Sequence, residues 1–259
     1  MGARQMRADS DGYVDIWLAH VHALAEEIGP RGSTTEAERR GSEYCEQVLA
    51  RLDLSPAMEP FTSARSMYLP YVLVQVPMLI AFALYPLAGR VSAGIAAILS
   101  LVALASAVLE LSLRDNPLRW LLPKGPSQNV VATIPPAGEH RQDLVLIGHV
   151  DSHRTPHMFS SPSWVVAFQV FLVIDFVLAV AQVVLYFLGT VTQWGWIWPA
   201  TIPGAICALL LVAHHLHADR TPFSAGANDN ATGAGLVLTL AGHLQAEPLQ
   251  HTQVWLAST

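Results

Sequence analysis

Long apolar stretches alternate with polar blocks along this chain. Four stretches cover residues 67–89, 91–113, 164–188 and 196–213, and each is long enough to cross a bilayer, which needs about 20 apolar residues in a helix. Only the short segments PLAGR and GTVTQWGW separate the members of each pair. The pattern therefore predicts two transmembrane helical hairpins, residues 67–113 and 164–213. Buried core helices of a soluble protein are the alternative, which four such stretches in one short chain disfavour.

The composition agrees with a membrane protein. Hydrophobic residues make up 52% of the 259 residues and charged residues 13%, and the mean hydropathy is +0.38, which is too apolar for an ordinary soluble domain. The net charge of -6 argues against nucleic acid as a partner. Cys45 and Cys207 provide no disulfide framework. Trp194, Trp196 and Trp198 are typical of an aromatic belt at a membrane surface.

The first polar block, residues 1–66, predicts two helices and a strand. Apolar positions at helical spacing from Val14 to Ile28 indicate a helix that the following Gly-Pro pair ends. A second helix begins near Thr35, which fits a capping box with Glu38. The segment MEPF then has an extended pattern.

The other two polar blocks, residues 114–163 and 214–259, predict further strands and one helix. QNVVATI and DLVLIGHV have strand patterns, with PPAGEHRQ as the turn between them, and TQVWLAS is another strand. A helix is expected from about Ala231 to Gln245. The continuous apolar run LVLIG is typical of a strand buried on both faces. Together the blocks predict an α/β fold, a mixed sheet with helices on both faces, interrupted by the two hairpins.

Candidate metal ligands stand at two places in these blocks. His149 and Asp151 follow directly after LVLIG, and the carboxyl end of a strand is where α/β sheets bind ligands. His149 can bind a metal through one ring nitrogen while Asp151 accepts the other ring N–H. Asp229 stands in the glycine-rich segment SAGANDNATGAG, where a carboxylate can bridge two metals. The simpler alternative is that Asp229 or Asn230 caps the following helix.

Four pieces of the chain, in order, resemble the M28 family of zinc aminopeptidases. They are the segment from IGPRGSTTEAERRGS to MEPF, then NVVATIPP, LVLIGHVDSH and GANDNATGAGLVLTLAGHL, which together make up most of the sequence outside the apolar stretches. The resemblance implies that His149 is a terminal ligand of one zinc, that Asp151 is the catalytic-site acid that orients it, and that Asp229 bridges two zinc ions. It also implies a cis peptide bond between Asp229 and Asn230.

The chain departs from the family pattern in two ways. An apolar hairpin separates Asp151 from Asp229, and the sequence ends at Thr259, before the Glu-Glu pair that the family has directly after the strand matching TQVWLAST. We therefore expect the N-terminal part of a membrane-bound zinc aminopeptidase that removes N-terminal residues from peptides, inactive by itself. A non-catalytic scaffold or receptor of the same fold, or a glutaminyl-cyclase-like zinc enzyme, are the alternatives.

Basic residues predict the orientation in the membrane. The polar blocks carry six near the apolar stretches, whereas the short links carry Arg90 alone; the six are Arg65, Arg114, Arg119, Lys124, Arg154 and Arg220. Positive residues flank spans on the cytoplasmic side, so we expect a multi-pass protein with its peptidase domain in the cytoplasm and the lipid bilayer and a peptide as partners. Asp175, inside the third stretch, is either a functional intramembrane acid or a hydrogen-bond partner between helices.

Overall fold

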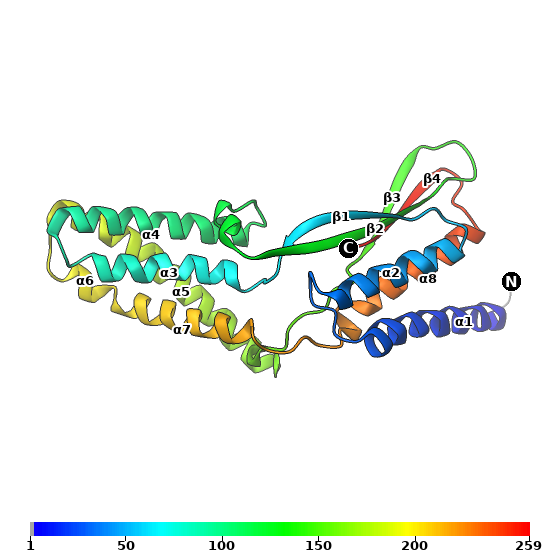
Figure 1. Cartoon of the computed structure of the whole chain (residues 1–259), viewed down its shortest axis with the longest axis horizontal. Helices are drawn as coiled ribbons and strands as arrows, with labels where there is room; N and C mark the ends of the chain where they lie inside the picture. The colour runs from blue at the N-terminus through cyan, green and yellow to red at the C-terminus, as the bar shows by residue number, and fades with distance from the viewer. Residues whose placement is uncertain (1–2) are drawn as a thin grey trace. The chain divides into compact units, whose positions relative to one another are not determined.

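The computed structural model describes residues 3–259, with side chains from residue 12 onward (Figure 1). The chain forms two compact units, each built from separate segments. The first contains residues up to Arg65 together with Lys124–Arg154 and Pro222–Thr259, and the second contains Ser66–Pro123 and Thr155–Thr221. The polar blocks thus supply most of the first unit and the apolar stretches most of the second.

The first unit contains a mixed four-stranded sheet. Its strands are β1 (Ala57–Ala64), β2 (Lys124–Ile134), β3 (Gln142–Gly148) and β4 (Thr252–Ser258), in the order β1-β2-β4-β3. β2 is antiparallel to both β1 and β4, whereas β3 is parallel to β4. The predicted strands and the mixed sheet are therefore confirmed. β2 and β3 do not pair with each other, because β4 lies between them, so PPAGEHRQ is a wider connection than the predicted turn.

Three helices belong to this unit: α1 (Ala3–His22), which continues into the π-helical turn η1 (Ala23–Ile28), α2 (Glu36–Arg51) and α8 (Thr232–Ala246). The Thr35 hydroxyl accepts the N–H of Glu38 and caps α2, as predicted. The Glu38 carboxylate in turn accepts the N–H of Thr34 at 2.6 Å, one residue before the position that a capping box uses. η1 ends at Gly29, whose φ of 81° suits glycine.

The core of the first unit lies between the sheet and the helices α2 and α8, which pack on the same face of the sheet (Figure 1). It is made of alternate strand residues and one side of each helix: Cys45, Leu49, Val130, Ala132, Ile134, Val237, Leu238, Ala241, Val254 and Leu256. The prediction of helices on both faces is wrong for the described residues. β3 is an edge strand rather than one buried on both faces, and Val145, Ile147 and Trp255 on the uncovered face are 54%, 65% and 39% exposed.

The second unit is a bundle of helices: α3 (Leu69–Leu84), α4 (Gly89–Leu111), α5 (Pro162–Thr192), the short α6 (Ile197–Ala200) and α7 (Ile202–Ala218). The link between α3 and α4 lies beside the link between α5 and α6, because Tyr85 stacks on Tyr186 at 4.4 Å and Phe82 stacks on Trp198 at 5.2 Å. The helices thus form two hairpins whose links share one end of the bundle.

Two of these helices, α4 and α5, are long and apolar enough to cross a membrane by length and composition. α3 and α7 have 16 and 17 residues and are shorter than the stretches predicted from the sequence. Proline explains the difference at both places. α3 ends just before Pro86, and the last stretch breaks at Thr201, where α6 ends and Pro203 enters the first turn of α7.

Candidate metal centre

His149 and Asp151 lie directly after β3, where the chain is fixed from both sides. The N–H of Val150 donates to the carbonyl of Thr259 at 2.6 Å, and the N–H of Thr259 donates to the carbonyl of Gly148 at 3.1 Å. The parallel pairing of β3 with β4 therefore continues past the last strand residue. Val150 is fully buried, and because side chains alternate along an extended chain, its neighbours His149 and Asp151 face the solvent side.

The imidazole of His149 contacts a carboxylate at each ring nitrogen. Its Nδ1 lies 2.9 Å from Oδ1 of Asp151, and its Nε2 lies 3.2 Å from Oδ1 of Asp229. The hydrogen bond to the Asp151 carboxylate raises the pKa of His149, against the opposing effect of partial burial. The structure thus confirms that His149 and Asp229 meet, although a whole helical hairpin separates them in the sequence.

In the turn that carries Asp229, the side chains of Asp229 and Asn230 make different contacts. The turn begins at Gly226, whose φ is +67°, and continues through η4 (Ala227–Ala231) with a cis peptide bond between Asp229 and Asn230, as predicted. Oδ1 of Asn230 accepts the N–H of Gly233 in the first turn of α8 at 3.1 Å. Asn230 is therefore the residue that caps α8, and the Asp229 carboxylate is available to His149.

A glycine contact explains why the end of β3 and the start of α8 come so close. A Cβ on Gly148 would lie 2.7 Å from the backbone nitrogen of Ala234 and 2.7 Å from the carbonyl carbon of Gly233. No larger residue fits there without moving backbone. Because Gly148 precedes His149 and Gly233 follows Asp229 by four positions, this approach brings the two candidate ligands together.

Sequence reasoning missed Arg31, which lies beside the candidate ligands. Its side chain is fully buried, and its Nε donates to the carbonyl of Val150 at 2.9 Å. Its Nη1 and Nη2 donate to the carbonyls of Ala225 and Gly226 at 3.0 and 3.3 Å. A single arginine after a Gly-Pro pair is typical of a solvated turn, so the sequence holds no signal for this role beyond its place in the segment that resembles the M28 family.

The three candidate side chains are open to solvent. Those of His149, Asp151 and Asp229 are 44%, 37% and 65% exposed. Within residues 3–259 the structure shows no group of three or more His, Cys, Asp or Glu side chains placed to hold a metal ion. This also holds for the histidines near the end of α7, where Nδ1 of His215 donates to the carbonyl of Leu211 at 2.8 Å and the ring stacks on Tyr71. His153 likewise bonds to the carbonyl of Arg154.

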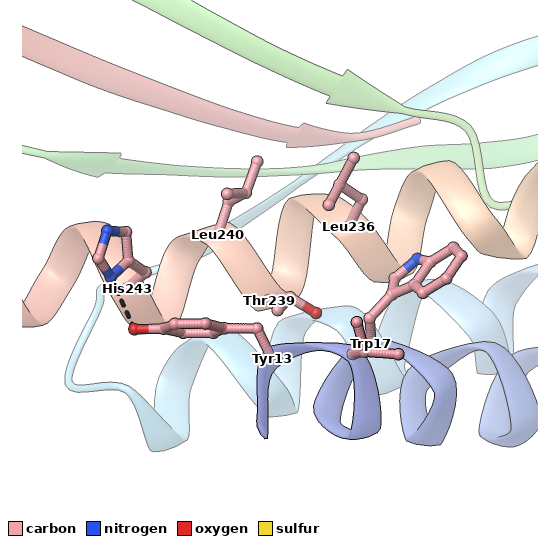
Figure 2. A pocket seen from close by; sticks show the side chains of 7 residues that line it. Tyr13, Trp17, Leu236, Thr239, Leu240 and His243 are labelled. Atoms are coloured by element: carbon pink, nitrogen blue, oxygen red, sulfur yellow. Dashed lines mark hydrogen bonds between the residues drawn. The ribbon is translucent and has the colours of Figure 1, made fainter. Parts of the chain in front are cut away.

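A pocket of about 330 Å³ lies elsewhere in the first unit, between α1 and α8 (Figure 2). Apolar side chains form most of its wall, and the hydroxyl of Tyr13 bonds to Nδ1 of His243 at 2.9 Å at one end. Its lining residues are Tyr13, Val14, Trp17, Leu236, Thr239, Leu240 and His243. The pocket follows the length of α8, whereas Asp229 precedes the first residue of that helix, so it is separate from the candidate metal centre.

Comparison with sequence families and characterised proteins identifies no relative. No family model matches the chain, and no curated protein matches it.

Solved structures show only a weak likeness. They include glutaminyl cyclases from Tannerella forsythia and Fimbriiglobus ruber, with TM-scores of 0.46 and 0.43 and identities of 13% and 14%. A zinc aminopeptidase from Bacillus subtilis has a TM-score of 0.42 and 12% identity. Each alignment covers 93–94% of this chain but only 45%, 43% and 60% of the respective structure. At TM-scores below 0.5 these similarities carry no weight for the function of this chain.

Proposed function

We propose that the first unit carries part of the metal site of a zinc-dependent aminopeptidase-type hydrolase. One observation carries the proposal: a single imidazole, that of His149, contacts the carboxylates of Asp151 and Asp229 through its two nitrogens. A histidine that binds a metal through one nitrogen usually donates its other ring N–H to a carboxylate. A non-catalytic scaffold would have no need for this arrangement.

Each of the three side chains has a distinct task in this proposal. His149 and Asp229 would hold the metal, and a zinc ion bound there would supply Lewis-acid polarisation of the peptide carbonyl. Asp151 accepts a hydrogen bond from the Nδ1–H of His149, which would leave Nε2 as the nitrogen that binds the metal beside Asp229. Asp151 is in this sense a positioning residue, which agrees with its place at the end of the short β3–Val150 connection.

The number of ligands limits what this chain can do with zinc. His149 and Asp229 are two ligands, whereas a catalytic zinc site usually has three protein ligands. We therefore expect the 259-residue chain to bind zinc weakly and to show no peptidase activity. Substrates of the proposed enzyme are peptides with a free N-terminus.

Zinc titration of the purified chain in detergent, followed by calorimetry, tests this proposal. We expect His149→Ala and Asp229→Ala to abolish the weak binding, and Asp151→Asn to weaken it by about 10- to 100-fold because the tautomer is no longer fixed. His153→Ala is the matched control, since His153 follows the same strand end but bonds to the carbonyl of Arg154. Zinc binding that is indifferent to His149→Ala would refute the site.

We also propose that the second unit lies in a membrane. Its helices bury several polar side chains among apolar ones and expose mainly large apolar side chains, whereas a soluble bundle exposes polar ones. Asp175 accepts a hydrogen bond from Gln75 at 2.8 Å, and Gln182 donates to the Ser100 hydroxyl at 3.2 Å, all four side chains being buried. The exposed side chains of α5 are mostly apolar: Val166, Val170, Val173, Ile174, Val177, Val180, Val184 and Leu188. Lipid is the surrounding in which this arrangement is stable.

A further inference from the structure

Arg31 is bound almost entirely to the backbone. Its guanidinium donates to carbonyls in three segments of the chain: Leu24 within η1 and Gly29 directly after it, Val150 after β3, and Ala225 and Gly226 before Asp229. Within the described residues no carboxylate forms an ion pair with it. A fully buried guanidinium is costly unless its donors are satisfied, so the carbonyls that converge on it are a built feature of the fold.

The segments that Arg31 connects are those that carry the candidate ligands. The carbonyl of Val150 lies between His149 and Asp151, and the carbonyl of Gly226 lies three residues before Asp229. The guanidinium therefore holds one backbone atom on each side of the contact between His149 and Asp229.

The backbone of Arg31 makes the same connection a second time. Its N–H donates to the Ser152 hydroxyl at 2.9 Å, and its carbonyl accepts the N–H of Ser152 at 2.7 Å. The Ser152 hydroxyl then donates to the carbonyl of Ser224 at 2.9 Å. Arg31 thus joins the two ligand-bearing loops through its side chain and through Ser152.

Two glycines leave the space that this arrangement needs. A Cβ on Gly41 of α2 would lie 2.5 Å from Cγ1 of Val150 and 3.0 Å from Cδ of Arg31. A Cβ on Gly226 would lie 2.5 Å from Cβ of Ser152 and 3.0 Å from Nη2 of Arg31. The packing around the guanidinium is therefore close on two sides, and a side chain at either glycine would displace the arginine or its neighbours.

We propose that Arg31 is a positioning residue for the metal site: its guanidinium fixes the loop after β3 against the loop before Asp229, so that His149 and Asp229 stay within reach of one metal ion. The inference rests on the proposed function. Only a planar group with five donors reaches carbonyls in three directions, and lysine, with a single ammonium, does not.

Cobalt(II) binding to the full chain in detergent is the first test. We expect Arg31→Lys to weaken binding by about 10- to 100-fold, the loss typical of removing a residue that orients metal ligands. Leu49→Ala is the matched control, because Leu49 is fully buried in the core of the same unit but lies on α2, outside both ligand-bearing loops. It should lower the melting temperature and leave the cobalt affinity of the folded protein unchanged. Equal losses of affinity in both variants would mean that Arg31 acts only through stability.

A metal-free measurement separates this inference from the proposed function. His149→Cys with Asp229→Cys, in a Cys207→Ala background, places two thiols across the loops for a short bifunctional thiol reagent. We expect efficient cross-linking with Arg31 in place and its loss in Arg31→Lys. The pair Glu59→Cys with Asn129→Cys, neighbours across β1 and β2, is the control and should cross-link in both backgrounds.

The two measurements distinguish failure of the positioning role from failure of the metal proposal. If the chain binds no cobalt but Arg31→Lys abolishes cross-linking, the positioning role stands and the metal proposal fails. If cross-linking between positions 149 and 229 is unchanged in Arg31→Lys, the positioning role is refuted whatever the metal does. Should Arg31→Lys fail to fold, Ser152→Ala removes the second connection alone, and the inference then predicts a partial loss of cross-linking.

Discussion

At the scale of single residues, Gly148 decides how closely β3 approaches α8. Gly148→Ala would place a Cβ 2.7 Å from the backbone of Gly233 and of Ala234, and backbone cannot move as a flexible side chain does. We expect a loss of about 1–3 kcal/mol in the free energy of unfolding, as for overpacked cores, together with weaker zinc binding. Thermal and denaturant unfolding measure the first effect and calorimetry the second.

Gly195→Ala is the control for this substitution, because a Cβ on Gly195 would meet no atom within 4 Å. It should unfold as the unmodified chain does. If Gly148→Ala were as stable as Gly195→Ala, the close approach of β3 and α8 would not be what positions His149.

The buried carboxyl group of Glu38 should make the stability of the first unit depend on pH. Burial raises the pKa of Glu38, although the Ser127 hydroxyl at 2.8 Å and the N–H of Thr34 at 2.6 Å favour its ionised form. The folded chain thus holds the proton more tightly than the unfolded chain. The contribution of Glu38 to stability is fully present below its unfolded-state pKa and is lost as the pH rises through the raised pKa.

Glu38→Gln removes this titration and keeps an oxygen that can accept a hydrogen bond. Between about pH 4 and pH 7, the free energy of unfolding of the unmodified chain should fall relative to that of Glu38→Gln. Urea unfolding at a series of pH values measures the difference. A difference that rises with pH would show that the two hydrogen bonds outweigh burial.

At the scale of elements, α5 has two faces with opposite environments. Asp175 and Gln182 point into the bundle, seven residues apart, whereas Val177 is 59% exposed. If lipid surrounds the outer face, Val177→Asp should cost about 2.5–3.5 kcal/mol of insertion free energy. The fraction of protein that stays in membranes after alkaline extraction measures the effect.

Asp175→Asn is the matched control on the same helix, since an asparagine oxygen can still accept the hydrogen bond from Gln75. We expect it to remain in the membrane fraction. If Val177→Asp also stayed there at the same level, α5 would not face lipid, and burial against another protein surface would be the better explanation of its apolar side.

At the scale of the whole molecule, the proposed membrane location predicts a topology: if both hairpins cross the membrane twice, the segments of the first unit lie on one side of it. The links Tyr85–Ala88 and Gln193–Trp196 lie at one end of the bundle, so both should be accessible from the opposite side. Gly195→Cys probes a link and Glu139→Cys probes the first unit, in a Cys207→Ala background. Both substituted positions are exposed.

An impermeant maleimide applied to intact cells should label Gly195→Cys and should label Glu139→Cys only after lysis, because the basic residues near the first unit favour the cytoplasm. Cys45 is not expected to interfere, since burial raises the pKa of its thiol to about 11. Labelling of Glu139→Cys from outside and of Gly195→Cys only after lysis would reverse the orientation.

The local pattern of the sequence was sufficient for most elements. The capping residue Thr35, the Gly-Pro pair after Ile28 and the alternation of TQVWLAS each place an element by interactions within a few residues, and the structure confirms them. The motif around His149 and the glycine-rich turn around Asp229 could be identified as candidate metal sites for the same reason. The residue types that bind metals, and the glycines that permit a tight turn, are visible within a few positions of the sequence.

The arrangement of those elements was decided by tertiary contacts. A continuous apolar run such as LVLIG occurs in strands that are covered on one face and in strands that are covered on both. The sequence therefore did not reveal that β3 is an edge strand with Val145 and Ile147 exposed. Nor did it reveal Arg31, whose partners are backbone carbonyls that every residue carries. Side-chain identity determines local structure and candidate chemistry, whereas the pairing of distant backbone segments depends on how the whole chain packs.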